Sequence, residues 1–134
     1  MVPTRFIMVA SSVCLAVSGL ALLFAPTESL GLVGISETNP FTGQLLGAAF
    51  LGNAVANWTA RGSMIGGIYA RPLSLANYVH FVVGGISLMV GLAQGKGGAG
   101  YIAVLFVYSV FGALFSLMLF GGRGRKRSSN EAQQ

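Results

Sequence analysis

Long apolar stretches dominate this chain, and its charged residues lie between or after them. Four such stretches cover about residues 6–24, 41–60, 73–93 and 101–120, and none contains a charged residue. Each is close to the roughly 20 residues that an α-helix needs to cross the hydrocarbon core of a bilayer. The pattern therefore predicts an all-α membrane protein that forms an antiparallel four-helix transmembrane bundle.

Helix-start signals support these boundaries. Asn39-Pro40 is typical of an N-cap followed by the first helical residue of the second stretch. We expect Arg71 to be extended and Pro72 to open the third helix. The glycine-rich segment 95–100 separates the third stretch from the fourth.

The first stretch could instead be a signal peptide, because Arg5 precedes it. However, no small-x-small cleavage site stands out, and Pro26 directly follows Ala25. We therefore interpret it as an uncleaved span.

Composition supports a membrane environment. Apolar residues make up 54% of the 134 residues and charged residues 8%, against about 25% charged in a soluble domain. The net charge of +5 could suggest nucleic acid as a partner. The basic residues form no stripe interleaved with aromatics, so we predict the lipid bilayer as the partner and no nucleic acid.

The distribution of basic residues predicts an orientation. With four spans, seven of the eight basic residues share one side, and only Lys96 lies on the other with Glu28 and Glu37. Basic residues favour the cytoplasmic side, so both termini are predicted to be cytoplasmic. We divide the chain into a four-span domain, 1–122, and a basic tail, 123–134, predicted to be disordered. The tail residues Arg123, Arg125, Lys126 and Arg127 are candidates for binding lipid headgroups, or serve only as a topology signal.

Small residues recur at helical spacing in every stretch, which favours close helix packing in lipid. The predicted packing faces are Ser11, Cys14 and Ser18 in the first stretch; Gly43 and Gly47, then Ala48, Gly52, Ala56 and Ala60, in the second; Gly84, Ser87 and Gly91 in the third; and Ser109, Gly112 and Ser116 in the fourth. Some of these faces could instead contact a partner, in a homo-oligomer or a larger membrane complex.

Polar side chains inside a span are costly and usually face the interior of the bundle. Spans two and three run in opposite directions, so the cytoplasmic end of span two lies at the depth of the start of span three. This predicts a polar cluster at the cytoplasmic mouth, composed of Asn53, Asn57, Arg61, Tyr69, Arg71, Asn77 and His80.

This cluster admits three interpretations. It could be a hydrogen-bonded clasp that fixes helices two and three. It could bind a small anionic ligand or lipid headgroup, because two arginines without a nearby carboxylate favour an oxyanion. His80 could also act as an acid or base in a membrane enzyme.

No cofactor or metal site is predicted. A lone cysteine, Cys14, forms no internal disulfide and is interpreted as a small buried apolar residue. Haem ligation by His80 would need a second axial ligand. Gly95-x-Gly97-x-x-Gly100 matches a dinucleotide fingerprint, but it joins two spans and is interpreted as a turn.

The residues around this cluster resemble a segment of small, uncharacterised bacterial four-span membrane proteins. The segment reads Asn57-Trp58-x-Ala60-Arg61-Gly62, Gly67-Ile68-Tyr69-x-Arg71-Pro72 and Asn77-x-x-His80-Phe81. The four-span layout also loosely resembles the DoxX-like group. The resemblance implies a bacterial inner-membrane protein and supplies no activity.

These observations lead to one expected function and two alternatives. We expect a small integral membrane protein that serves as a non-enzymatic subunit or scaffold of a membrane complex. The first alternative is a binder or transporter of a small anionic or amphipathic molecule or lipid at the cytoplasmic mouth. The second is an enzyme that uses His80.

Overall fold

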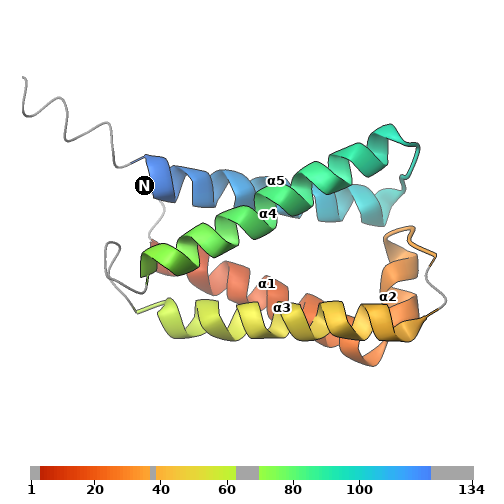
Figure 1. The fold of residues 1–134 in the computed structure, drawn as a ribbon, viewed down its shortest axis with the longest axis horizontal. Helices are drawn as coiled ribbons and strands as arrows, with labels where there is room; N and C mark the ends of the chain where they lie inside the picture. Colours follow the sequence, from red (N-terminus) through yellow and green to blue (C-terminus); the bar gives the residue numbers. More distant parts are fainter. Residues whose placement is uncertain (1–3, 37–38, 63–69, 122–134) are drawn as a thin grey trace, which may run out of the picture.

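The structure, a computed structural model, describes residues 4–36, 39–62 and 70–121. These residues form five helices and no strand (Figure 1). The helices are α1 (Thr4–Phe24), α2 (Pro26–Leu32), α3 (Pro40–Ala60), α4 (Ala70–Ala93) and α5 (Ala99–Phe120). The predicted all-α class is confirmed. Helices α1, α4 and α5 are long and apolar enough to cross a membrane.

One predicted helix start is confirmed, and another is wrong. Asn39 caps α3 as predicted, because its side chain accepts a hydrogen bond from the N–H of Phe41 at 3.0 Å. The prediction that Arg71 is extended is wrong, because α4 already begins at Ala70. Pro72 lies in the first helical turn, where a missing N–H costs no intrahelical bond.

The four long helices pack as two antiparallel hairpins, α1 with α3 and α4 with α5 (Figure 1). In the first, the backbones nearly touch: a Cβ on Gly47 would lie 2.7 Å from the carbonyl oxygen of Gly19. In the second, the rings of Tyr108 and Tyr101 occupy the space that side chains would need at Gly84 and Gly91. The turn between α4 and α5 needs glycine at Gly95 and Gly98, which have φ of +85° and +145°.

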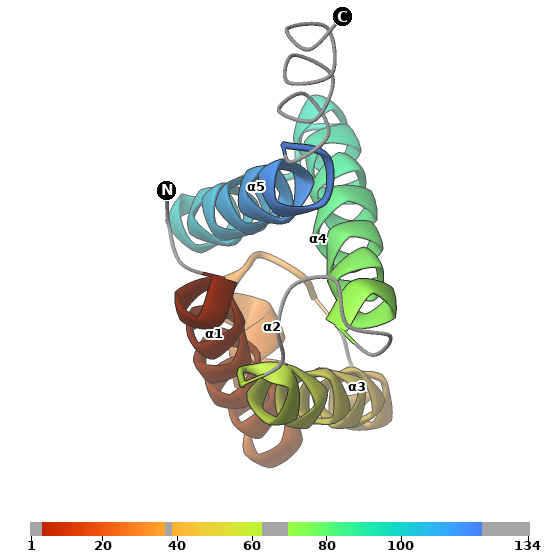
Figure 2. The ribbon, with the colours of Figure 1, turned by 90° about the vertical axis from the view of Figure 1, so that its left-hand side faces the viewer.

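Helix α2 lies across one end of both hairpins, between the four long helices in Figure 2. Its Pro26 contacts α3 at Gly43, and the carbonyl of Leu32 contacts α5 at Gly100. Its first turn carries Glu28, whose pKa is lowered by a hydrogen bond from its own backbone N–H and by one from the Thr27 hydroxyl. We call this the α2 end, and the opposite end, with Arg5, Arg61 and Arg71, the basic end.

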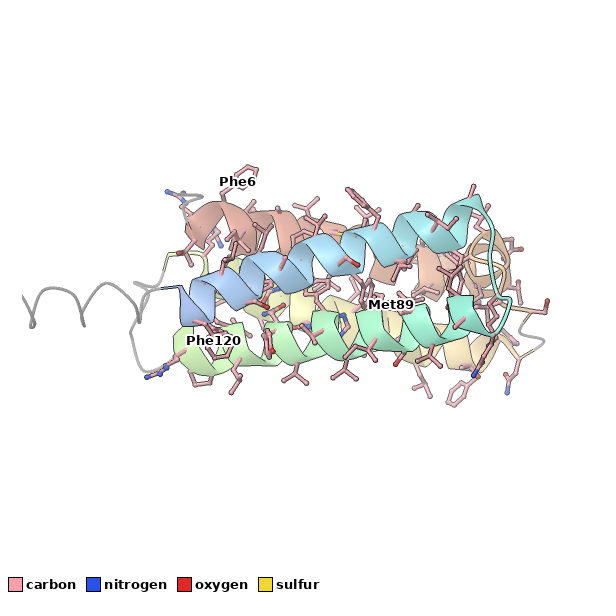
Figure 3. All side chains as sticks on the ribbon, turned by 90° about the horizontal axis from the view of Figure 1, so that it is seen from above. Phe6, Met89 and Phe120 are labelled. Carbon is pink, nitrogen blue, oxygen red and sulfur yellow. The ribbon has the colours of Figure 1, made fainter. Side chains whose placement is uncertain are left out.

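The outer surface of the bundle is apolar on every long helix. Phe6 on α1, Val55 on α3, Val83 on α4 and Phe106 on α5 are each more than half exposed, and Phe6 points away from the bundle in Figure 3. The core is small and combines Ile7, Met8, Leu15, Ala54, Phe81 and Phe115. So much exposed apolar surface is typical of a protein that lipid surrounds.

The predicted packing faces are only partly used within the chain. Gly43, Gly47, Gly91 and Gly112 are buried, as is Ser11. Ala48, Gly52, Ser87 and Ser109 are exposed, so the prediction that they pack inside the bundle is wrong for this chain. Cys14, Ser18, Ala56, Ala60, Gly84 and Ser116 are half-buried. Gly19, which the sequence pattern did not single out, lies directly against the backbone of α3 at Gly47 and Leu51.

Candidate functional site

The seven residues of the predicted polar cluster do not form one group. Tyr69 lies outside the described residues, as do the tail residues Arg123, Arg125, Lys126 and Arg127. The other six separate into a buried amide pair, a half-buried asparagine, two arginines nearer the surface and a histidine among aromatic rings. Each part has its own chemistry.

Asn57 of α3 and Asn77 of α4 form a reciprocal amide pair, and both are fully buried. The Nδ2 of Asn57 donates to the Oδ1 of Asn77 at 2.8 Å, and the Nδ2 of Asn77 donates back at 2.6 Å. This pair joins the two hairpins at the same depth, as the antiparallel arrangement predicts.

Further hydrogen bonds saturate the pair. Asn57 also donates to the hydroxyl of Ser11 at 3.1 Å, and Asn77 also donates to the carbonyl of Leu73 at 2.9 Å. Nearby, Ser12 donates to the carbonyl of Ala54 at 2.7 Å. A primary amide has two N–H donors, so neither asparagine keeps one for a ligand. We call Ser11, Asn57 and Asn77 the clasp; its geometry favours the structural interpretation.

The arginines lie apart from the clasp. The guanidinium of Arg61 lies 4.1 Å from the centroid of the Trp58 ring and donates to the backbone carbonyl of Trp58. Arg71 is exposed in the first turn of α4. Asn53 is half-buried. The arginines therefore present their charge at the surface of the basic end.

His80 faces α5 rather than the clasp. Its Nε2 lies 3.3 Å from the hydroxyl oxygen of Tyr108. The rings of Phe50 and Phe81 meet its imidazole edge-on, with centroids 5.4 and 5.0 Å away. Helices α3, α4 and α5 thus each contribute to this aromatic group, which lies between the clasp and the middle of the bundle.

A cavity of about 550 Å³ lies between the hairpins, and Phe50, Phe81 and Tyr108 of the aromatic group form part of its wall. All five helices contribute to it, and the described lining includes no charged residue. Cys14 and Ser18 of α1, Ser29 of α2 and Tyr108 of α5 are its polar members. Leu30, Leu32 and Ile35 line it near the α2 end. An apolar cavity of this size is expected to hold hydrocarbon rather than water.

The sequence pattern did not predict this cavity. Its walls come from residues that are far apart in the chain, and most are ordinary Leu, Val, Ala and Phe positions. Cys14 was predicted to be buried; it is half-buried and faces the cavity instead. Comparisons with protein-family models, curated proteins and solved structures give no match. The resemblance to DoxX-like proteins therefore stays a prediction from the sequence.

Proposed function

We propose that the protein crosses the membrane four times, with α3 as a span beside α1, α4 and α5. Helix α3 lies antiparallel against α1 from Gly47 beside Gly19 to Asn57 beside Ser11. If α1 crosses the bilayer, α3 is carried across with it. Its 21 residues, at about 1.5 Å each, match the hydrocarbon thickness.

The polar residues of α3 lower its overall hydropathy without facing lipid at mid-span. Asn57 is fully buried in the clasp, and Asn53 is half-buried. Leu45, Val55 and Trp58 are exposed on its outer side. A span tolerates such amides where a neighbouring helix accepts their hydrogen bonds.

Single cysteines introduced into a Cys14→Ser protein test this topology in intact cells. We expect a membrane-impermeant maleimide to label Ser36→Cys and to leave Thr4→Cys and Ser128→Cys unlabelled until the cells are opened. Four spans place both termini on the cytoplasmic side, as the basic residues favour. Labelling of Thr4→Cys and Ser128→Cys on opposite sides would show an odd number of spans.

We infer that the bundle binds a hydrophobic or amphipathic molecule between its hairpins, and that it does so without catalysing a reaction. The cavity of about 550 Å³ carries this inference, since ligand sites usually measure about 300–1,000 Å³. The clasp has no free donor, and the two arginines lie apart from it at the surface of the basic end. We therefore place the molecule in the cavity. The surrounding bilayer supplies hydrocarbon chains of the required chemistry.

Native mass spectrometry of the detergent-extracted protein tests this binding. Val104 lines the cavity from α5 and is half-buried, whereas Ile102 on the same helix is exposed and outside the lining. We expect a bound lipid-sized mass on the wild type and on Ile102→Trp, and its loss on Val104→Trp, because the indole extends into the cavity and obstructs the bound chain. Equal retention by both variants would contradict the proposal.

A subunit role in a membrane complex is the second candidate. The small residues Ala48 and Gly52 face outward on α3, and Gly52 has open space where a Cβ would lie. Small residues on a lipid-facing surface permit close approach of another helix. Cross-linking of Gly52→Cys in the Cys14→Ser protein, with Val83→Cys on α4 as control, would support this role. Failure of Gly52→Cys to cross-link above the control would argue against a partner at this face.

A further inference from the structure

Among the polar residues that line the cavity, Tyr108 is the one whose hydroxyl meets His80. The ring of Tyr108 lies over Gly84, which leaves no room for a Cβ. This packing fixes the ring and directs its hydroxyl toward the His80 Nε2, 3.3 Å away. Tyr108 therefore brings a positioned hydroxyl to the wall of a mostly apolar cavity.

The pair retains hydrogen-bonding capacity after its mutual bond. A phenol hydroxyl has one donor and can also accept, and a neutral imidazole has one donor and one acceptor. If Tyr108 donates to His80, its oxygen can still accept a hydrogen bond. If His80 donates, the Tyr108 hydroxyl can still donate. Within a bilayer no bulk water competes for that capacity.

The rest of the lining limits what the ligand can be. No charged side chain lines the cavity among the described residues, so an ionised carboxylate, phosphate or ammonium would be buried without a counter-charge. On the side of the basic end, Phe81 stacks with Phe111 and Phe115, with centroids 4.9 and 5.8 Å apart. Toward the α2 end the walls are Leu30, Leu32, Leu88 and Ala103. A hydrocarbon chain therefore has room on the α2 side of Tyr108.

We propose that the cavity takes a neutral long-chain lipid with a hydroxyl or carbonyl group. Its oxygen hydrogen-bonds the Tyr108–His80 pair, and its chain extends toward α2. This proposal rests on the proposed function, because it names the class and the orientation of the molecule bound between the hairpins.

Two probes of equal length test the recognition of the oxygen: a C16 alcohol and a C16 alkane, each with a diazirine at the chain end. Tyr108→Phe removes the hydroxyl and keeps the ring over Gly84. Tyr101→Phe is the matched control, since its hydroxyl donates to the Leu88 carbonyl and it does not line the cavity. We expect Tyr108→Phe to weaken binding of the alcohol about 2- to 10-fold, the value of one hydrogen bond. Binding of the alkane should not change, and Tyr101→Phe should affect neither probe.

The photolabelled positions test the orientation. With the alcohol, we expect labels in α2 and near Ala103, because the diazirine is at the end remote from the oxygen. Labels at Phe50 and Phe81 would reverse the orientation and overturn the proposal. Equal effects of Tyr108→Phe on both probes would overturn the role of the hydroxyl while leaving binding in the cavity intact. If neither probe binds the wild-type protein, the proposed function itself is wrong.

Discussion

The two hairpins solve the problem of packing in lipid by different means. Between α1 and α3 the backbones approach directly: a Cβ on Gly19 would lie 2.9 Å from the Gly47 carbonyl oxygen, and one on Gly47 2.7 Å from that of Gly19. Between α4 and α5, the side chains of Tyr108 and Tyr101 fill the space beside Gly84 and Gly91. A clash with a backbone atom is relieved only by moving the whole helix, whereas a clash with a side chain is relieved when that side chain rotates. The first interface should therefore tolerate added volume less than the second.

The places where the two hairpins contact each other explain the position of the cavity. The hairpins meet at the clasp and at the hydrophobic core, which combines residues of α1, α3, α4 and α5, and they are also joined through α2 at the other end. Between these two connections a cavity of about 550 Å³ remains. The cavity thus lies between the two regions where the hairpins are joined.

Gly47→Ala should give the largest loss of stability. The added methyl meets the Gly19 carbonyl, so α1 and α3 must separate along the whole interface. Overpacking usually costs about 1–3 kcal/mol and occasionally more, and we expect about 3 kcal/mol here because the obstacle is backbone. SDS titration of the detergent-solubilised protein, monitored by circular dichroism, measures this change in the free energy of unfolding.

Gly52→Ala is the matched control on the same helix, because nothing lies within 4 Å of its added Cβ. It should leave stability unchanged or raise it by up to about 1 kcal/mol, through loss of backbone freedom in the unfolded chain. Similar losses for the two variants would mean that the α1–α3 contact is not the close one described.

Gly84→Ala should give a smaller loss, about 1–2 kcal/mol. Its methyl meets the ring of Tyr108, which can tilt into the cavity. In a Tyr108→Ala background the same substitution should cost almost nothing, because the obstructing ring is gone. The coupling energy from the double-mutant cycle measures this directly. An undiminished cost in that background would show that backbone, not the ring, limits the space at Gly84.

The lengths of the apolar stretches predicted much of this fold. The predicted stretches 41–60 and 101–120 became helices Pro40–Ala60 and Ala99–Phe120, because continuous apolarity and capping residues act locally. Helix α2 was not predicted, because its seven residues are too few to show the apolar pattern of a span. Pro26 at its first position and Glu28 in its first turn were the available signals.

Which neighbouring helix the His80 side chain faces was harder to predict than which one the Asn77 side chain faces. Residues three apart on a helix differ by about 60° around its axis, so His80 turns toward α5 while Asn77 turns toward α3. Ala48 and Gly52 show a related limit. A row of small residues indicates a surface that a helix could approach closely, but not whether that helix belongs to the same chain.

A change in the clasp should lower stability about as much as Gly84→Ala, and it is the most diagnostic of these changes. Asn57→Leu removes the bonds to Asn77 and Ser11 and leaves the Asn77 amide partly unpaired in the bundle. Interhelical hydrogen bonds in membranes average about 0.6 kcal/mol each, so we expect a loss of about 1–2 kcal/mol. Asn53→Leu, one turn earlier and half-buried, is the control and should change stability little.

The double variant Asn57→Leu with Asn77→Leu distinguishes a structural clasp from a binding site. Replacing both partners with apolar residues of similar shape leaves no polar group unpaired, so it should be more stable than Asn57→Leu alone. Because the clasp has no donor left for a ligand, the double variant should also retain the lipid-sized mass that Val104→Trp loses. Loss of that mass in the double variant, at unchanged stability, would instead assign ligand binding to the asparagines and move the site from the cavity to the basic end.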